Sequence, residues 1–328
     1  MRCLYYESKG FDPYENLAME EALLDVVGED EICFYLWQNE RTVVIGRNQN
    51  PWKECRTEKL EEAGGKLARR LSGGGAVFHD SGNLNFTFIV GKKNYDINRQ
   101  LQVIVEGLKE LGVKAEFSGR NDLLVNGKKF SGNAYYFGKT MAYHHGTLMF
   151  DVDLDNLMTY LQVSPLKMQA KGIDSVRSRV TNLKEENSAI TLETLKEALK
   201  RAFLKVYESD TLEMAQIPEE KKQTIQEKYA SWEWRFGETP KFDVELAKKF
   251  SWGLVDFNIQ LKSGTIQKAM FFSDAMDVGF VQNCSQSLEG QLFDKDAICG
   301  KLKTLETENE LQATMKTEII DWLARAEL

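Results

Sequence analysis

The sequence has few cysteines, no long apolar run and no excess of positive charge. Its five cysteines form no CxxC pair and are odd in number, which counts against a disulfide framework and against a cysteine-based metal site. We expect free thiols in a reducing cytosol. No apolar stretch approaches the roughly 20 residues of a membrane helix, and residues 1–9 lack the apolar core of a signal peptide. The sequence therefore predicts a cytoplasmic protein that is not anchored in a membrane.

The remaining composition is that of an ordinary globular chain. Hydrophobic residues make up 42% of the 328 residues and charged residues 28%, which is typical of a soluble folded protein. The net charge of -8 at pH 7 argues against broad binding to nucleic acid or to anionic membranes. We expect a large domain with a small companion, and a monomer.

Apolar periodicity predicts an α/β (α+β) fold in two parts, residues 1–244 and residues 245–328. In the first part the pattern predicts strands at 32–37, 42–46, 66–70, 83–90 and across 114–150, with helices at 14–27, 53–65, 96–111, 152–161, 191–207 and 218–231. In the second part it predicts a hairpin at 254–272 and helices near 286–305 and 309–326. In the strand at 83–90, one face is predicted to carry Leu84, Phe86, Phe88 and Val90, and the other Asn83, Asn85 and Thr87.

Three consecutive glycines, Gly73 to Gly75, stand between two arginines and a histidine in the segment RRLSGGGAVFHDSGN. A glycine turn lets backbone N–H groups surround an anion, because no Cβ blocks the approach. The segment matches neither the P-loop pattern GxxxxGK(S/T) nor the dinucleotide-binding pattern GxGxxG. A purely structural turn is therefore as well supported as an anion-binding loop. Asn83, Asn85 and His79 nearby suggest a polar pocket floor, although a lone histidine is more often structural.

The Asn-Gly pair at 126–127 predicts a two-residue hairpin turn. In that register Asp122 lies opposite Ser131 and shares a face with Lys129. A lysine beside a carboxylate and a hydroxyl is suited to holding two anions together, and we predict this role for Lys129. Lys128 is expected to be a solvated residue at the hairpin tip. A shift of one residue in the strand register would place these three side chains on different faces of the hairpin.

A third stretch, KGIDSVRSRVTNLKE at residues 171–185, carries several basic residues and no clear core stripe. One interpretation is a solvated basic loop. The other is a mobile cover that neutralises a phosphate-bearing ligand.

Together these stretches resemble the lipoate–protein ligases of the biotin/lipoate ligase family. The resemblance is carried by RRLSGGGAVFHDSGN, GRNDLLVNGKKFSGNAYY, HHGTL and KGIDSVRSRVTNL, with support from ENLAMEEAL, TVVIGRNQNPWKEC and SWEWRFG. It runs over nearly the whole chain, in order and with compatible spacing. It implies a large catalytic domain with mixed sheets and helices at 1–244 and a small C-terminal α+β accessory domain at 245–328.

The resemblance also implies an ATP-dependent reaction in two steps. Lipoate and MgATP give lipoyl-AMP and pyrophosphate, and the lipoyl group then passes to a lysine of a carrier domain. The implied carriers are the lipoyl domains of 2-oxoacid dehydrogenase complexes and the glycine cleavage H protein. The implied substrates are lipoate and ATP with Mg²⁺, and no tightly bound cofactor is expected. A fixed cation between the carboxylate and the α-phosphate would lower their repulsion and hold the attack geometry.

Individual site residues follow from the same match, with Lys129 as the central lysine that contacts both the acyl group and the phosphate. The match places around ATP or the adenylate Arg70, Gly75, Ala76, Val77, Phe78, Asp122 (also as a Mg²⁺ ligand), Arg177 and Arg179. It places around lipoate Glu20, Trp37, Arg70, Ser72, Gly73, Gly74, His79 and His145. Residues 171–182 match the loop that covers the adenylate. Tyr136 departs from the family pattern, which has a basic residue there.

Two alternatives to a ligase stay open. An octanoyl- or lipoyl-transferase of the same fold would move the acyl group through a cysteine thioester. No cysteine lies between Cys55 and Cys284, the segment with every other site motif, which counts against a transferase. A non-catalytic lipoyl-binding protein is the second alternative, against which Lys129 and the intact adenylate loop argue.

Overall fold

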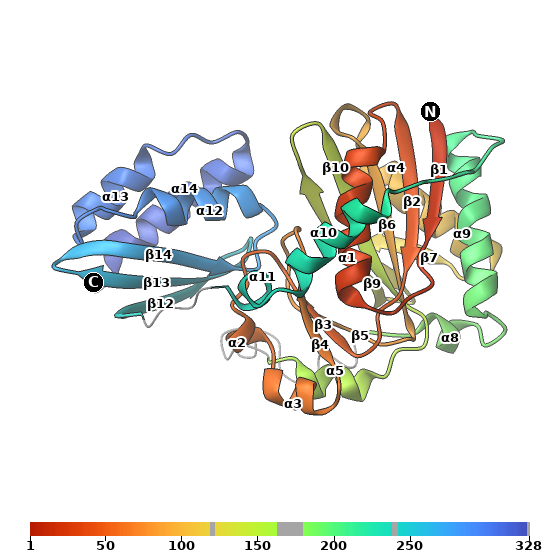
Figure 1. Ribbon diagram of the computed structural model, residues 1–328, viewed down its shortest axis with the longest axis horizontal. Coiled ribbons are helices and arrows are strands. Elements are labelled where there is room, and N and C mark those ends of the chain that lie inside the picture. Colours follow the sequence, from red (N-terminus) through yellow and green to blue (C-terminus); the bar gives the residue numbers. More distant parts are fainter. Residues whose placement is uncertain (119–121, 163–179, 238–241, 327–328) are drawn as a thin grey trace.

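The computed structural model describes residues 1–118, 122–162, 180–237 and 242–326. The chain forms a large α/β lobe followed by a small α+β lobe (Figure 1), which confirms the predicted fold class. Within the described residues, the large lobe has an eight-stranded mixed sheet in the order β11-β1-β2-β6-β10-β9-β8-β7. Its strands are β1 (Arg2–Glu7), β2 (Glu31–Trp37), β6 (Asn83–Gly91), β7 (Ala115–Ser118), β8 (Asp122–Val125), β9 (Lys128–Phe137), β10 (Met141–Met149) and β11 (Glu213–Met214).

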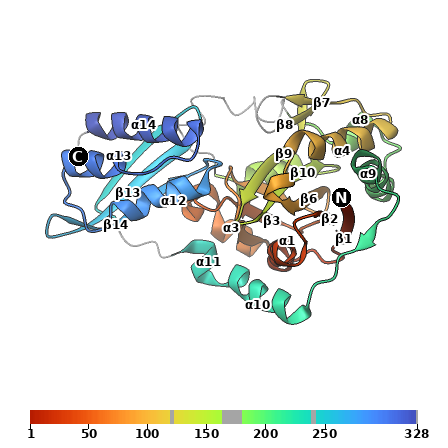
Figure 2. The ribbon, with the colours of Figure 1, turned by 90° about the horizontal axis from the view of Figure 1, so that it is seen from above.

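Helices cover both faces of this sheet (Figure 2). On one face α1 (Pro13–Val26) packs with α10 (Glu219–Ala230), and on the other α4 (Ile97–Glu110) packs with α9 (Leu192–Tyr207). The shorter helices of the lobe are α5 (Leu154–Tyr160), α8 (Leu183–Glu186), α11 (Trp232–Phe236) and the 3₁₀ helix η1 (Lys92–Asn94).

Alternating side chains in β6 and β2 create the two cores. Phe86 and Phe88 in β6 and Phe34 in β2 pack in the core shared with α4 and α9. Tyr35 and Trp37, on the opposite face of β2, pack in the core shared with α1 and α10. Strand alternation sends successive residues to opposite faces. The alternation predicted for residues 83–90 is confirmed, and β2 alternates in the same way.

A second, three-stranded sheet carries the glycine segment. Strand β3 (Thr42–Ile45) pairs in parallel with β4 (Lys66–Arg69) and antiparallel with β5 (Val77–His79). Residues 70–76, named the glycine loop here, connect β4 to β5 along one end of this sheet. The large lobe therefore presents the glycine loop as a connection between two well-anchored strands.

The single helix predicted at 53–65 is wrong, because α2 (Pro51–Glu54) and α3 (Thr57–Glu62) are separate helices. Cys55 between them is extended, with φ -133° and ψ 137°, and it forms a bridge with Leu161. The Arg56 backbone N–H donates to the Tyr160 carbonyl at 2.9 Å. These bonds to the end of α5 replace the helical bonds that would have joined α2 to α3.

The small lobe has its own apolar core. Its antiparallel strands are β12 (Val244–Lys249), β13 (Leu254–Lys262) and β14 (Thr265–Ser273), and its helices are α12 (Val278–Ser287), α13 (Lys295–Lys303) and α14 (Glu310–Arg325). The predicted hairpin is confirmed, with Ser263 and Gly264 at positive φ in its turn. The single helix predicted near 286–305 is wrong: α12 ends at Ser287, and Gly290 at φ 79° turns the chain before α13.

All five cysteines are free and buried, as the odd number and the spacing predict. Each helix within the described ranges is too short or too polar to cross a lipid bilayer.

Candidate functional site

A cavity of about 270 Å³ opens between the glycine loop and strands β6, β9 and β10, and it is called the central cavity here. The predicted site residues that line it are Trp37, Arg70, Gly74, Gly75, Ala76, Val77, His79, Asp122, Lys129 and His145. The glycine segment, the β8–β9 hairpin and the HHGTL motif therefore meet around one space.

The lining of the central cavity divides into an exposed, charged part, called the mouth here, and a part lined by buried side chains, called the closed end here. The side chains of Lys129 and Asp122 are 38% and 42% exposed. Trp37 and Leu17, which line the same cavity, are only 3% and 1% exposed. Asn85, on the predicted polar floor, also lines it and is buried. An apolar acid would therefore place its carboxylate beside Lys129 and its tail at the closed end.

Lys129 lies at the mouth with its Nζ 2.7 Å from Oδ1 of Asp122, so the predicted pairing of these two on one hairpin face is confirmed. The predicted register beyond them is wrong, because Ser131 pairs with Leu123 rather than with Asp122. The register shifts by one residue at Phe130, whose side chain is fully buried in the main core. A β-bulge lets that ring reach the core while Lys129 keeps the cavity side.

Arg70 holds the glycine loop in shape. Its guanidinium donates to the backbone oxygens of Gly73 at 2.6 Å and Gly75 at 2.8 Å, and to Ser72 Oγ at 3.0 Å. Burial lowers the pKa of Arg70 to about 10, which leaves it charged at neutral pH. Gly74 adopts φ 88°, a conformation that side chains with a Cβ rarely adopt. The buried guanidinium of Arg70 thus holds the glycine loop in a defined conformation.

Arg69, the neighbouring arginine, points away from the central cavity. It donates to the carbonyl oxygens of Gln49 and Arg235, both at 2.7 Å. Burial, with a smaller contribution from Arg47, lowers its pKa to about 9. Arg69 therefore ties β4 to α11, and only one arginine of the pair belongs to the cavity wall.

Next to the lining of the central cavity, polar side chains form a hydrogen-bonded network. Glu20 Oε1 accepts from His145 Nδ1 at 2.8 Å and from Thr87 Oγ1 at 2.7 Å, while His145 Nε2 lies 2.8 Å from Ser72 Oγ. His145 lines the cavity, whereas Glu20 and Ser72 stand behind it. Glu20 and Ser72 therefore act on the cavity through the orientation of the His145 ring.

His79 lies at the closed end and is buried. Burial, followed by the nearby charges of Arg70 and His145, lowers the pKa of His79 to about 3. The imidazole is therefore neutral at physiological pH and serves as a hydrogen-bonding group. Phe78, the next residue back along β5, points to the other side and stacks on Tyr160 with ring centroids 5.3 Å apart. Phe78 thus lies outside the cavity lining.

The described end of the segment predicted as a cover, from Val180 onward, contacts Lys129 through its backbone. Val180 forms a parallel bridge with Lys129, and the Thr181 N–H donates to the Lys129 carbonyl at 3.0 Å. Arg177 and Arg179 lie outside the described residues.

Met276 of the small lobe completes the cavity wall. Gly73 faces the same lobe, and a Cβ there would overlap the backbone of Ala275 and Met276. The Ser273 N–H donates to the Asn48 carbonyl at 2.8 Å. The glycine loop is therefore shaped for close approach of the small lobe as well as for the cavity.

Sequence reasoning missed part of the lining. The lining residues that it did not single out are Leu17, Val44, Gly132, Asn133, Ala134, Gly146, Thr147 and Met276. Those in β9 and β10 lie inside the motifs GRNDLLVNGKKFSGNAYY and HHGTL, so their position in these motifs was a usable signal for them. Leu17, Val44 and Met276 have no chemical signature that separates them from core residues.

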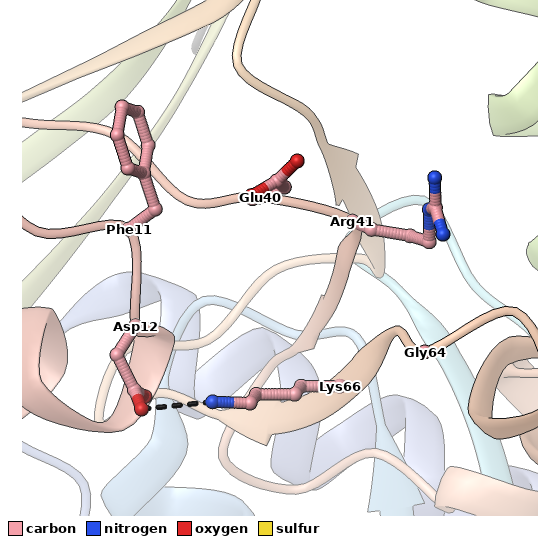
Figure 3. A pocket seen from close by; sticks show the side chains of 6 residues that line it. All are labelled: Phe11, Asp12, Glu40, Arg41, Gly64 and Lys66. Atoms are coloured by element: carbon pink, nitrogen blue, oxygen red, sulfur yellow. Dashed lines mark hydrogen bonds and ion pairs between the residues drawn. The ribbon is translucent and has the colours of Figure 1, made fainter.

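A second hollow, of about 390 Å³, lies on the surface around Phe11, Glu40, Arg41 and Gly64 (Figure 3). The ion pair of Lys66 with Asp12, at 2.8 Å, spans its floor. The hollow shares no lining residue with the central cavity among the described residues. Its polar, exposed character gives no reason to place the predicted chemistry there.

A lysine at the exposed mouth and buried apolar side chains such as Leu17 and Trp37 in the same cavity are features expected of a site for an acid with an apolar tail. Residues 12–204 match the protein family described as "Lipoyl protein ligase A/B catalytic domain". Residues 239–323 match the family described as "Bacterial lipoate protein ligase C-terminus". The chain is 40% identical to "Lipoate-protein ligase A" of Psychrobacter cryohalolentis over 333 aligned positions, covering 98% of each chain. The chain belongs to the lipoyl protein ligase A/B family.

Solved structures agree with this membership. P. falciparum LipL1, crystallised in complex with lipoate, is 29% identical with a TM-score of 0.85, covering 99% of each chain. A bi-partite lipoate protein ligase from Thermoplasma acidophilum is 28% identical with a TM-score of 0.63, covering 74% of this chain and 98% of that one. A lipoate-protein ligase A bound with ATP is 26% identical with a TM-score of 0.61, covering 72% and 98%.

Proposed function

We propose that this protein activates lipoate with MgATP to lipoyl-AMP and then transfers the lipoyl group to a lysine of a lipoyl carrier domain. The observation that carries the proposal is the Lys129 ammonium, which lies beside Asp122 at the exposed mouth of a cavity whose other part is lined by buried side chains. Relatives support it: one was solved with lipoate, one with ATP, and one was studied with its E2 lipoyl domain. The carriers proposed are lipoyl domains of 2-oxoacid dehydrogenase complexes and the glycine cleavage H protein.

The chemistry needs a cation more than a nucleophile. A carboxylate oxygen of lipoate attacks the α-phosphorus of ATP, and pyrophosphate leaves. The amine of the carrier lysine then attacks the acyl carbonyl, and AMP leaves. Lys129 between the carboxylate and the phosphate offsets their repulsion and stabilises the charge that develops in both steps. The Arg70-supported glycine loop forms the wall against which the nucleotide would lie.

Asp122 is the proposed Mg²⁺ ligand. Among the described residues, no group of three or more histidine, cysteine or acidic side chains could hold a metal ion. Mg²⁺ usually binds through one or two carboxylates together with substrate phosphates, so a single carboxylate at the mouth fits a metal that arrives with ATP. We propose that Arg177 and Arg179 contact the phosphates from the cover.

Trp37 is proposed to set the size of the tail that enters. Its indole is buried, and its Nε1 donates to Thr87 Oγ1 at 3.0 Å. Trp37→Ala is expected to admit bulkier acids and to weaken preference for the natural tail, because a buried indole fills much of the space. Ligation rates across a series of carboxylic acids check this. An unchanged order of preference would remove Trp37 from the tail-binding wall.

We place the boundary between a catalytic domain, residues 1–244, and an accessory domain, residues 245–328. Lys53 joins the two lobes through Asp256 at 2.6 Å and Glu245 at 3.0 Å. The accessory domain carries none of the three motifs, so residues 1–244 are expected to bind synthetic lipoyl-AMP but to form it more slowly. Calorimetry and pyrophosphate release measure the two effects. Folded residues 1–244 that bind no lipoyl-AMP would show that the accessory domain supplies an essential part of the site.

The cysteines separate a ligase from a thioester-forming transferase. None of the five, all within the described residues, lines the central cavity. Burial raises the pKa of Cys55 and of Cys284 to about 12, which disfavours the thiolate that a thioester requires. Replacing all five with serine is therefore expected to keep ligation within about tenfold, since no thioester forms. Loss of transfer with intact lipoyl-AMP formation would favour the transferase instead.

The function itself is tested by incubating the protein with lipoate, MgATP and an unmodified lipoyl domain and weighing the domain. We expect a mass gain of one lipoyl group, dependent on ATP, with equimolar pyrophosphate. A domain whose mass stays unchanged while the protein binds lipoate would indicate the non-catalytic alternative.

A further inference from the structure

The closed end of the central cavity contains a hydrogen-bond donor that the protein leaves unused. His79 Nε2 is buried and has no partner among the described residues, although the ring lines the cavity. The other ring nitrogen, Nδ1, lies 3.2 Å from Asn39 Nδ2. Which nitrogen of His79 carries the proton therefore depends on the orientation of the Asn39 amide.

A chain of contacts determines that orientation. The Asn16 amide lies 2.7 Å from the Gln38 carbonyl oxygen, which only accepts, so the amide nitrogen of Asn16 must face it. The same nitrogen donates to Asn39 Oδ1 at 3.0 Å. Asn39 thus turns its oxygen to Asn16 and its nitrogen to His79. An amide nitrogen only donates, so His79 Nδ1 accepts and the ring proton resides on Nε2.

Asn85 adds a second donor on the same wall. Its Oδ1 accepts from Asn83 Nδ2 at 2.9 Å, whereas its own Nδ2 is buried without a partner among the described residues. Asn85 is 1% exposed and His79 is 3% exposed, and both line the cavity. An unpartnered buried donor destabilises a folded protein, so two of them on one wall indicate a ligand that accepts hydrogen bonds.

We propose that the closed end of the cavity selects acyl tails carrying a hydrogen-bond acceptor, with His79 Nε2–H as the principal donor and Asn85 as the second. This inference rests on the proposed function, under which the acceptor is a sulfur of the dithiolane ring of lipoate. A thioether-like sulfur is a weak acceptor, and a plain alkyl tail such as that of octanoate has none. The two donors therefore discriminate between acids of similar length and shape. The neutral state of His79 keeps Nε2–H as a donor and Nδ1 as an acceptor throughout the physiological pH range.

The sharpest test varies the ligand and leaves the protein unchanged. Binding of lipoate is compared by calorimetry with that of two acids of equal length, one ending in a cyclopentane ring and one in an oxolane ring. In a purely apolar pocket the oxolane acid would bind more weakly, because its ether oxygen would lose water without gaining a partner. We expect it to bind at least as tightly as the cyclopentane acid, and lipoate to exceed the cyclopentane acid by about three- to tenfold.

Variants assign the effect to His79. His79→Leu removes the donor and is expected to lower the affinity ratio of the oxolane acid to the cyclopentane acid by about tenfold. His79→Gln places an amide N–H near the position of Nε2 and is expected to restore most of the ratio. Val44→Ala, on the same cavity wall, is the matched control, since losing apolar contact should weaken both acids alike.

The outcomes separate this inference from the proposed function. A wild-type protein that ligates lipoate but prefers the cyclopentane acid to the oxolane acid overturns the inference alone. A ratio that is the same in His79→Leu and in the wild type also overturns it. If the acceptor preference is present but no lipoyl group reaches a carrier, the proposed function fails and the inference stands.

Discussion

Replacing Lys129 with alanine is expected to slow both pyrophosphate release and acyl transfer from supplied lipoyl-AMP by about 10²–10³. The ammonium lies at the cavity mouth, 2.7 Å from Asp122, where the carboxylate and the α-phosphate meet in the proposed reaction. Without it the two anions repel one another, and the charge that develops on the phosphate and on the acyl oxygen loses its fixed counterion. Because the same group is proposed to serve both steps, both rates should fall.

Two neighbouring variants serve as controls. Lys128→Ala changes an exposed residue at the hairpin tip and should be nearly silent. Lys129→Arg should rescue poorly, because a broad planar guanidinium does not replace a compact point charge. A crippled Lys128→Ala beside a fully active Lys129→Ala would overturn the assignment of the central cation.

Replacing Arg70 with lysine is expected to damage stability and substrate binding together. The Arg70 guanidinium satisfies carbonyl oxygens of Val44, Gly73 and Gly75 as well as the Ser72 hydroxyl. Each buried acceptor left unpaired costs about 1–3 kcal/mol, so the free energy of unfolding in urea should fall by several kcal/mol. A loop released from this anchor should also raise KM for ATP and for lipoate by at least about tenfold.

Arg69→Lys is the matched control, because Arg69 is equally buried and also binds backbone carbonyls. It lies off the central cavity, so its loss should lower stability while KM values stay near those of the wild type. Equal KM changes in the two variants, or a normal KM in folded Arg70→Lys, would show that the glycine loop does not need Arg70.

The sequence predicts most of what depends on strand alternation. Phe86 and Phe88 face one core while Asn85 and Thr87 face the other way, as a period of two requires. The glycine loop and Lys129 meet in one cavity, as the family resemblance implied. These features are local, or follow from a pattern that many residues repeat.

The features that the sequence did not predict depend on tertiary contacts that no local sequence pattern encodes. The register of the β8–β9 hairpin changes because Phe130 turns into the core, and the break between α2 and α3 follows from a bridge to Leu161. Met276 reaches the cavity from the small lobe. Gly46, which contacts the glycine loop, lies more than two hundred residues earlier in the chain. The protonated nitrogen of His79 depends on contacts with Asn39, which only the structure reveals.

If lipoate becomes an acyl-adenylate before transfer, as proposed, the oxygen atoms of lipoate report on that step directly. Lipoate with both carboxylate oxygens replaced by a heavy isotope is ligated to an unmodified lipoyl domain, and the released AMP and the domain are weighed. We expect one heavy oxygen in the phosphate of AMP and the other in the new amide of the carrier. AMP that contains only ordinary oxygen, beside a fully lipoylated carrier, would contradict it.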